Sequence, residues 1–157
     1  MSDLLVKLYD LPDLRTLVSS LEKERILIRR AMAYEKHLAV NWVRDNFGTR
    51  WASECDIAFA NQPISCFLAT HDGQILGFAC YDSTCKDFFG PTGVLPAHRE
   101  RGIGKALLLA CLNSMREQGY AYAIIGAAGP QEFYAKAVGA IEIPGSMPGV
   151  YRDMLTE

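Results

Sequence analysis

The chain has 157 residues, with 16 Lys and Arg against 18 Asp and Glu, and half of its residues are hydrophobic. This length and composition predict a single domain, residues 1–157, with one hydrophobic core. The net charge of −2 argues against nucleic acid or an anionic membrane as a partner, and no apolar run approaches the ~18 residues that read as a membrane span.

The N-terminus lacks the basic flank and apolar core of a secretion signal, which favours a cytoplasmic protein. The five cysteines are odd in number and lack the spacing of metal ligands, so we expect reduced thiols and no metal site. They are Cys55, Cys66, Cys80, Cys85 and Cys111.

The first elements in chain order are a short strand over residues 3–9 and an amphipathic helix that opens at Leu11–Asp13. A charged break at 22–25 precedes a β-rich run, Ile26–Ile28. Two helical patterns follow, at 34–47 and 51–60, separated by Gly48.

Two strand patterns, 65–70 and 74–81, are joined by His71-Asp72-Gly73, and Asp-Gly is a strong hairpin signal. The next strand leads to Val94, Leu95 and Pro96. It contains Pro91, which cannot donate to a sheet ladder, so we expect a bulge or bend there.

A basic turn then leads into a long helical pattern that starts after Gly102 and stops at Gly119. Free backbone N–H groups and the helix dipole make such a helix start suitable for a phosphate, which glycine allows to approach closely. The glycine spacing fits neither a dinucleotide fingerprint nor a P-loop. What remains is Arg99-x-x-Gly102-x-Gly104; taken alone, it could also be a purely structural helix entry.

The remaining elements are a buried strand at 120–126 and a short helix from Gln131 to Val138. Two further segments, 140–143 and 149–155, are expected to form a final strand pair. The short helix carries Phe133-Tyr134-x-Lys136, followed by Gly139.

The Arg99-x-x-Gly102-x-Gly104 loop and the later Phe133-Tyr134-x-Lys136 element resemble, in order and separation, two motifs of the GNAT N-acetyltransferase superfamily. The resemblance covers residues 26–155. It implies an α/β (α+β) fold with a mixed, mostly antiparallel sheet flanked by helices. Residues 1–24 would then be an N-terminal strand–helix extension of a 26–155 core.

The resemblance implies acetyl-CoA as cosubstrate, with its pyrophosphate on the basic loop. Tyr134 would protonate the departing thiolate or simply hydrogen-bond the cofactor sulfur, and the Val94 N–H would stabilise the oxyanion. Glu100 stands where the family often has glycine, so we expect its side chain to point to solvent. The implied cofactor-binding residues are Val94, Leu95, Arg99, Glu100, Arg101, Gly102, Ile103, Gly104 and Lys105.

The helix pair at 34–60 would wall the acceptor site, with Glu35, Trp42, Trp51 and Phe88 as candidate substrate contacts. The tryptophans could equally be core residues, and the acids, with Glu54 and Asp56 among them, could belong to solvated faces. The general base stays open. Its candidates are Glu54, Asp56, Asp82, Asp87 and His98.

The resemblance implies an acetyl-CoA-dependent N-acetyltransferase that acts on a primary amine of a small molecule or protein by direct attack. The alternative is a non-catalytic acyl-CoA-binding or regulatory domain. A homodimer through residues 1–24 or the last strands is a further expectation.

Overall fold

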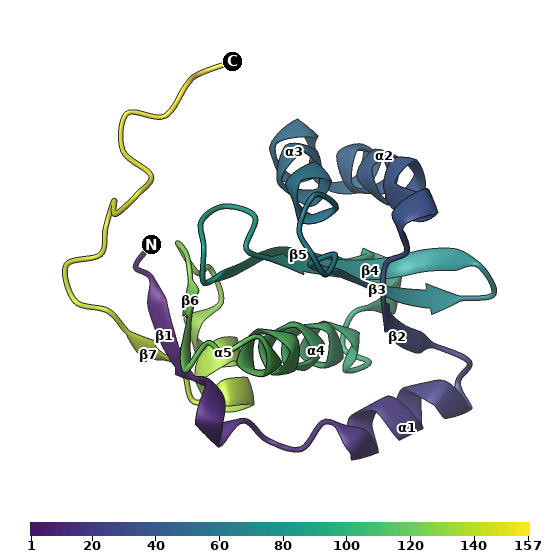
Figure 1. Cartoon of the computed structure of the whole chain (residues 1–157). Coiled ribbons are helices and arrows are strands. Elements are labelled where there is room, and N and C mark those ends of the chain that lie inside the picture. The colour runs from purple at the N-terminus through teal and green to yellow at the C-terminus, as the bar shows by residue number, and fades with distance from the viewer.

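The computed structural model describes all 157 residues as one mixed seven-stranded sheet with helices on both faces (Figure 1). The strands are β1 (Leu4–Lys7), β2 (Leu27–Arg30), β3 (Cys66–His71), β4 (Gln74–Tyr81), β5 (Phe88–Val94), β6 (Tyr122–Ile125) and β7 (Ile141–Glu142). The helices are α1 (Arg15–Lys23), α2 (Lys36–Phe47), α3 (Thr49–Ala58), α4 (Ile103–Glu117) and α5 (Gln131–Val138), and three short 3₁₀ turns occupy Leu8–Asp10, Ala33–Glu35 and Pro96–His98.

The strand order is β2-β3-β4-β5-β6-β1-β7, and every neighbouring pair is antiparallel except β5 and β6. The expected mixed, mostly antiparallel sheet is therefore confirmed. The N-terminal strand and helix are also present, but β1 is not an appendage. Leu4 pairs with Ile125 on one side and with Glu142 on the other, so β1 is an interior strand.

Two hydrophobic clusters fill the spaces above and below the sheet. The larger one packs α1, α4 and α5 against one face and includes Leu21, Leu107 and Val138. The smaller one packs α2 and α3 against the other face around Val43 and Phe78. Figure 1 shows these helix layers on opposite sides of the strands.

The β3–β4 hairpin and the irregular β5 strand form as the sequence predicts. Asp72 and Gly73 both have positive φ values, 47° and 78°, which suit a tight hairpin turn. The β4–β5 register shifts between the Ala79–Thr92 and Tyr81–Phe89 pairs, which leaves one extra residue on β5 beside Pro91. Proline offers no N–H for the ladder, which explains a bulge at this point.

Strands β5 and β6 separate soon after they meet. Only Phe88 and Phe89 pair with β6, opposite Ile124 and Ile125, and the rest of β5 pairs with β4 alone. One edge of β5 beyond the bulge is therefore free of any neighbouring strand.

The expected final strand pair is wrong in its second half. β7 has only two residues, and the segment 143–157 contains no strand. Pro144 and Pro148 cannot donate ladder hydrogen bonds, and β1 already occupies the inner edge of β7. The segment leaves the sheet and runs past β6 toward α3 (Figure 1).

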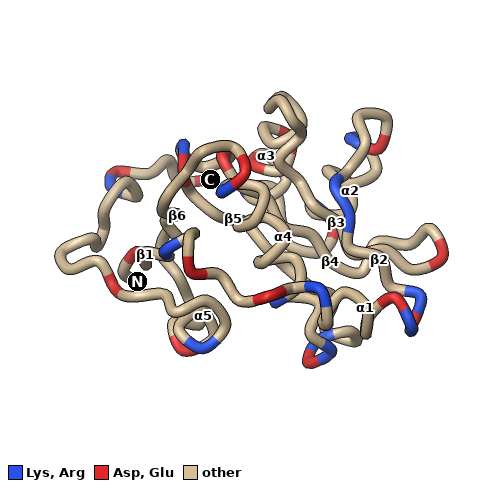
Figure 2. The backbone as a smooth tube through the Cα atoms, turned by 60° about the horizontal axis from the view of Figure 1, so that its bottom comes forward, with Lys and Arg blue, Asp and Glu red and all other residues tan.

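Acidic and basic residues are interspersed along the chain, for example around α1 and α5 (Figure 2). None of the helices combines the length and apolar character needed to cross a bilayer.

Candidate active site

A cavity of about 880 Å³ opens where β5 and β6 separate. Residues of α2, α3, β5, α4, β6 and α5 line it, together with Met1, the β4–β5 loop, Arg99, the loop after β6 and the C-terminal segment. Its functionally informative lining residues are Phe47, Trp51, Glu54, Thr84, Gly93, Val94, Arg99, Gly104, Phe133, Tyr134 and Tyr151.

The backbone of Val94 faces this cavity. The Leu95 N–H donates to the Leu76 carbonyl at 2.9 Å, and the neighbouring pair is Val94 with Gly77. Because hydrogen-bonded and non-hydrogen-bonded pairs alternate in an antiparallel ladder, the N–H and C=O of Val94 point away from β4. The C=O accepts a hydrogen bond from Arg99 Nε at 3.1 Å, which leaves the N–H directed into the gap between strands.

The start of α4 supplies a second set of directed N–H groups. Gly102 precedes the helix with φ of +86°, and Glu100 also has a positive φ, 66°. This turn precedes the unpaired amides of the first helical turn, an arrangement that suits an anion. A β-carbon on Gly104 would meet nothing closer than a Val94 methyl at 3.8 Å, so the space beside Gly104 is open.

The N-terminal segment braces this loop from behind. Arg101 donates to Glu24 Oε1 at 2.9 Å, and the Leu17 side chain lies only 2.8 Å from where a β-carbon on Gly102 would be. Glu100 is exposed and has no ion pair, so its carboxylate faces solvent. Helix α1 thus supports the conformation of the glycine-rich turn.

Tyr134 lies in α5 and also lines the cavity. Its ring is packed edge-on against Phe89 and Phe133, with centroid separations of 6.4 and 5.1 Å. Its hydroxyl makes no hydrogen bond within the chain, although the residue is 6% exposed. Burial raises the pKa of Tyr134 to about 12, so the phenol keeps its proton at neutral pH.

Aromatic and acidic side chains form the wall above β5. Phe47 lies over Gly93 and stacks on Trp51 with a centroid distance of 5.6 Å. A β-carbon at Gly93 would be 2.6 Å from the Phe47 ring, so glycine permits this close packing. Beside Trp51, the Glu54 carboxylate accepts a hydrogen bond from the Thr84 hydroxyl.

Three of the four candidate substrate contacts do not line the cavity, and Trp51 does. Trp42 packs into the core against Phe47 and Phe78. Phe88 lies against Gly126. Of the nine candidate cofactor contacts, Val94, Arg99 and Gly104 line the cavity. Leu95 does not, and its N–H is held in the β4–β5 ladder.

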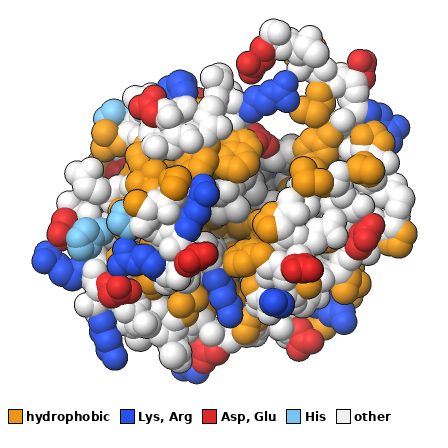
Figure 3. Space-filling model, turned by 180° about the vertical axis from the view of Figure 1, so that it is seen from behind, with side chains coloured by type: hydrophobic (Ala, Val, Ile, Leu, Met, Phe, Trp, Pro, Cys, Tyr) orange, Lys and Arg blue, Asp and Glu red, His pale blue; other side chains and the backbone are white.

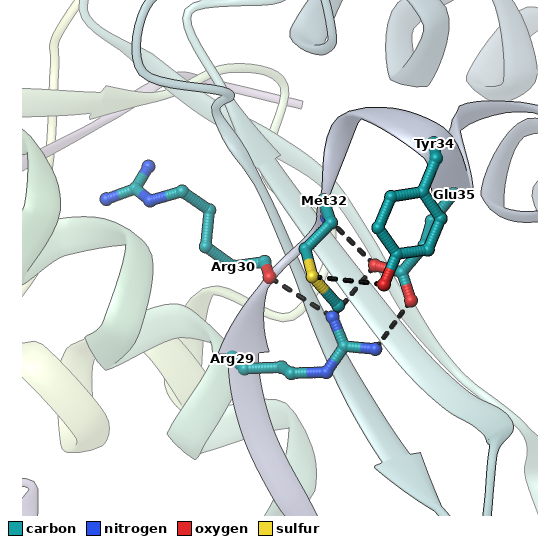
Figure 4. Close-up of polar contacts among 5 residues, drawn as sticks. All are labelled: Arg29, Arg30, Met32, Tyr34 and Glu35. Atoms are coloured by element: carbon teal, nitrogen blue, oxygen red, sulfur yellow. Dashed lines mark hydrogen bonds and ion pairs between the residues drawn. The ribbon is translucent and has the colours of Figure 1, made fainter.

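Glu35 has a local structural partner instead of a place in the cavity. Its carboxylate accepts hydrogen bonds from both terminal nitrogens of Arg29, at 2.8 and 2.7 Å, and from the Met32 N–H (Figure 4). The hydrogen bonds from Arg29 lower the pKa of Glu35. The figure also shows Arg30 pointing away from this group. The Arg29–Glu35 pair therefore fastens the turn between β2 and α2.

Of the five candidate bases, only Glu54 lines the cavity. Asp56 pairs with Lys36 on the surface, and His98 contacts Arg101. Asp82 and Asp87 lie together in the β4–β5 loop, where Asp82 accepts from the Asp87 N–H at 2.7 Å. The fold thus leaves Glu54 as the one candidate base inside the cavity, whereas the sequence had left five candidates open.

The structure gathers three cysteines that are distant in the sequence. The sulfur atoms of Cys55, Cys66 and Cys80 lie within 4.8 Å of one another, on α3, β3 and β4. All three are fully buried among apolar side chains, and burial raises the pKa of Cys80 well above its usual range. The side-chain hydrogen bonds from Cys66 and Cys80, in contrast, lower the pKa of Cys55 to about 5. The fold thus groups three sulfur atoms that the spacing of the cysteines in the sequence did not indicate.

Tyr151 and Phe47 are lining residues that the sequence analysis missed. Phe47 looked like an ordinary apolar residue of an amphipathic helix. Tyr151 fell within an expected strand, and nothing in its neighbourhood signals a cavity residue.

Solved structures resemble this chain in fold. The GCN5-related glucosamine N-acetyltransferase region of a fungal multi-domain β-N-acetylglucosaminidase has a TM-score of 0.72 and 17% identity over 90% of this chain. GCN5-related N-acetyltransferases from Sphaerobacter thermophilus and Kribbella flavida give TM-scores of 0.71 and 0.57, with 20% and 18% identity, again over 90% of this chain. The chain corresponds to only 19%, 48% and 53% of those three longer chains, respectively.

Comparison with curated protein sequences finds no match. The model of the acetyltransferase (GNAT) family matches residues 36–140, about two thirds of the chain. That span contains the glycine-rich loop, α4 and α5, whereas β1 lies outside it. Membership of this family supports acetyl-CoA as the cosubstrate. On this match and the shared fold, the chain belongs to the GNAT family of acetyltransferases.

Proposed function

We propose that this chain transfers the acetyl group of acetyl-CoA to a primary amine by direct attack, without an acyl-enzyme. The observation that carries the proposal is the shared cavity. A ladder-free N–H on Val94, an unpaired phenol on Tyr134 and a carboxylate on Glu54 all border it, beside the open start of α4 at Gly104.

Acetyl-CoA would lie along the free edge of β5, with its pyrophosphate at the N-terminus of α4. The amides of the first helical turn and the positive end of the helix dipole favour that charge. Arg99 adds a cation at the same end of the cavity. The thioester would then lie near the point where β5 and β6 separate, between Val94 and Tyr134.

In the reaction, the amine nitrogen attacks the thioester carbonyl carbon, and the carbonyl oxygen becomes negative. The Val94 N–H donates to that oxygen. The carbon–sulfur bond breaks, and Tyr134 gives its proton to the departing thiolate to form free CoA. The amine nitrogen loses one proton to form the amide, and Tyr134 regains its proton through solvent.

Glu54 would take up the proton that the amine must lose. It is the only one of the five candidate bases that lines the cavity, and it lies on the acceptor side, beside Trp51. Glu54→Gln should therefore lower kcat/KM for the amine while the affinity for acetyl-CoA stays as in the wild type.

Calorimetric titration with acetyl-CoA tests the donor site. We expect the wild-type chain to bind and Gly104→Glu to lose binding, because the new carboxylate would enter the phosphate-binding space. Gly104→Ala is the matched control for folding, since a β-carbon there has ordinary contacts. No binding by the wild-type chain would refute the proposal.

Tyr134→Phe separates an enzyme from a non-catalytic acyl-CoA-binding domain. The enzyme should lose about 10²-fold or more in kcat, the usual contribution of a positioned proton donor, and should keep its acetyl-CoA affinity. Tyr120→Phe is the control, because that hydroxyl bonds Asp82 outside the cavity. Binding of acetyl-CoA with no turnover by the wild-type chain on any amine would favour the binding-domain alternative.

A further inference from the structure

The C-terminal segment 143–157 crosses the open side of the cavity and is fastened at both ends. At its start, the Ile143 N–H donates to the Asp3 carbonyl at 2.9 Å, and the Asp3 N–H donates to Ser146 Oγ at 2.8 Å. At its far end, Arg50 of α3 donates to the Leu155 carbonyl at 3.0 Å. We call this segment the strap.

Seen from behind in Figure 3, the strap at the upper right arches over a hollow in the surface. It joins β1 and β7 at one side of the cavity to α3 at the other, as its path in Figure 1 also shows. An acceptor molecule that reaches the splayed strands from this side has to fit beneath it.

Tyr151 is the one strap residue that lines the cavity. Its hydroxyl would be 2.3 Å from a β-carbon on Gly126, the residue that follows the last β5–β6 pair at Ile125. The ring therefore reaches the point where the strands diverge. Burial is the main cause that raises the pKa of Tyr151 to about 12, and the nearby Asp3 and Glu54 carboxylates add to it. The side chain is therefore neutral there.

The acceptor end of the cavity is thus enclosed on several sides. Trp51 and Glu54 of α3, Thr84 of the β4–β5 loop, which donates to Glu54, and Tyr151 of the strap all line it. The whole cavity, about 880 Å³, is within the usual size of a small-molecule site, and it has to hold the pantetheine arm as well as the acceptor.

We infer that the strap restricts the acceptor to a small free amine and that the Tyr151 ring is the specificity-determining residue that excludes a lysine within a protein chain. This inference rests on the proposed function. A lysine side chain enters a site with its own backbone and neighbouring residues attached, and these would collide with the Tyr151 ring, by which the strap lines the cavity. A small amine occupies the enclosed space and presents its nitrogen to Glu54.

The test compares CoA release with two kinds of acceptor. One is a panel of small amines comprising ethanolamine, cadaverine, spermidine and glucosamine, and the other is an unstructured lysine-containing peptide. We expect the wild type to acetylate at least one small amine and to leave the peptide unmodified. Tyr151→Ala should raise KM for the small amine by about tenfold or more, and should allow peptide acetylation. The acetyl-CoA affinity should not change.

Tyr151→Phe keeps the ring and loses only the hydroxyl, so it should still exclude the peptide, because the ring and not the hydroxyl forms the wall. Arg44→Ala is the matched surface control, since Arg44 is exposed on α2 and bonds only Asn41. Peptide acetylation by the wild type as efficient as that of the best small amine would overturn the inference alone. The same holds if Tyr151→Ala leaves the preference unchanged. Acetyl-CoA binding with no turnover on any acceptor would instead overturn the proposed function and the inference together.

Discussion

The environments of two tyrosines in the cavity determine the protonation state of their phenols. Tyr134 and Tyr151 both have pKa values raised to about 12, and burial is the main cause for each. Since a phenol with a raised pKa holds its proton throughout the neutral range, Tyr134 can act only as a proton donor or hydrogen-bonding group. A fall in activity below pH 7 would therefore not report these phenols.

The environment of Asp87 should affect how the free energy of unfolding changes with pH. Its Oδ1 is buried without a hydrogen-bond partner, and burial, reinforced by Asp82, raises the pKa of Asp87 to about 6. A raised pKa favours the protonated form in the folded state. Its stabilising contribution is complete below the ordinary aspartate pKa and is lost as the pH rises through about 6.

Asp87→Asn should therefore match the wild type in urea midpoint at pH 4 and exceed it at pH 7, because the amide carries no charge to desolvate. The measurement is urea unfolding followed by circular dichroism at both pH values. Asp45→Asn, an exposed change on α2, should show no such pH-dependent difference. A wild-type midpoint above that of Asp87→Asn at pH 7 would contradict the assignment.

At the scale of elements, the glycine-rich turn depends on a helix that lies outside the family match. Leu17 of α1 packs against Gly102, whose φ is +86°. Gly102→Ala should destabilise the fold by about 1–2 kcal/mol from the left-handed backbone alone, with an added penalty from overlap with Leu17. Urea unfolding measures the total.

The double variant Leu17→Ala/Gly102→Ala separates the two contributions. Removing the Leu17 side chain should relieve the overlap but not the backbone strain, so the Gly102→Ala cost should be smaller in the Leu17→Ala background. Equal costs in both backgrounds would show that α1 does not brace the turn.

Local patterns in the sequence predicted the hairpin, the bulge and the start of α4 well. They predicted poorly which side chains would contact one another. Asp72-Gly73, Pro91 and Gly102 each impose a conformation through their own backbone, so the hairpin, the bulge and the start of α4 could be foreseen. Glu35 and Trp42 looked equally suited to a pocket, but their positions depend on Arg29 and Phe78, which come close only after folding. The gathering of Cys55, Cys66 and Cys80 has the same origin.

For the whole molecule, the finding that the sequence could not provide is the place of β1. The sequence of a short apolar strand does not indicate with which other strands it will pair. In addition, residues 1–24 precede the part of the chain that resembles the family. In the fold, Leu4 is 2% exposed and sits between β6 and β7.

Leu4→Ala should consequently cost about 2–5 kcal/mol of unfolding free energy, as expected of a leucine removed from a packed core. Leu27→Ala, on the edge strand β2, is the matched control and should cost far less, because Leu27 is 49% exposed. Equal losses in the two variants, measured by urea denaturation, would mean that β1 does not act as an interior strand.

The position of β1 also sets an order of events during synthesis. Strand β1 pairs with residues that lie more than a hundred positions further along the chain. It must wait, unpaired, until β6 and then β7 have been made, so the nascent chain cannot complete its sheet until almost all of this sequence has emerged. During that interval the apolar side chains of β1 lack the neighbours that bury them in the finished fold.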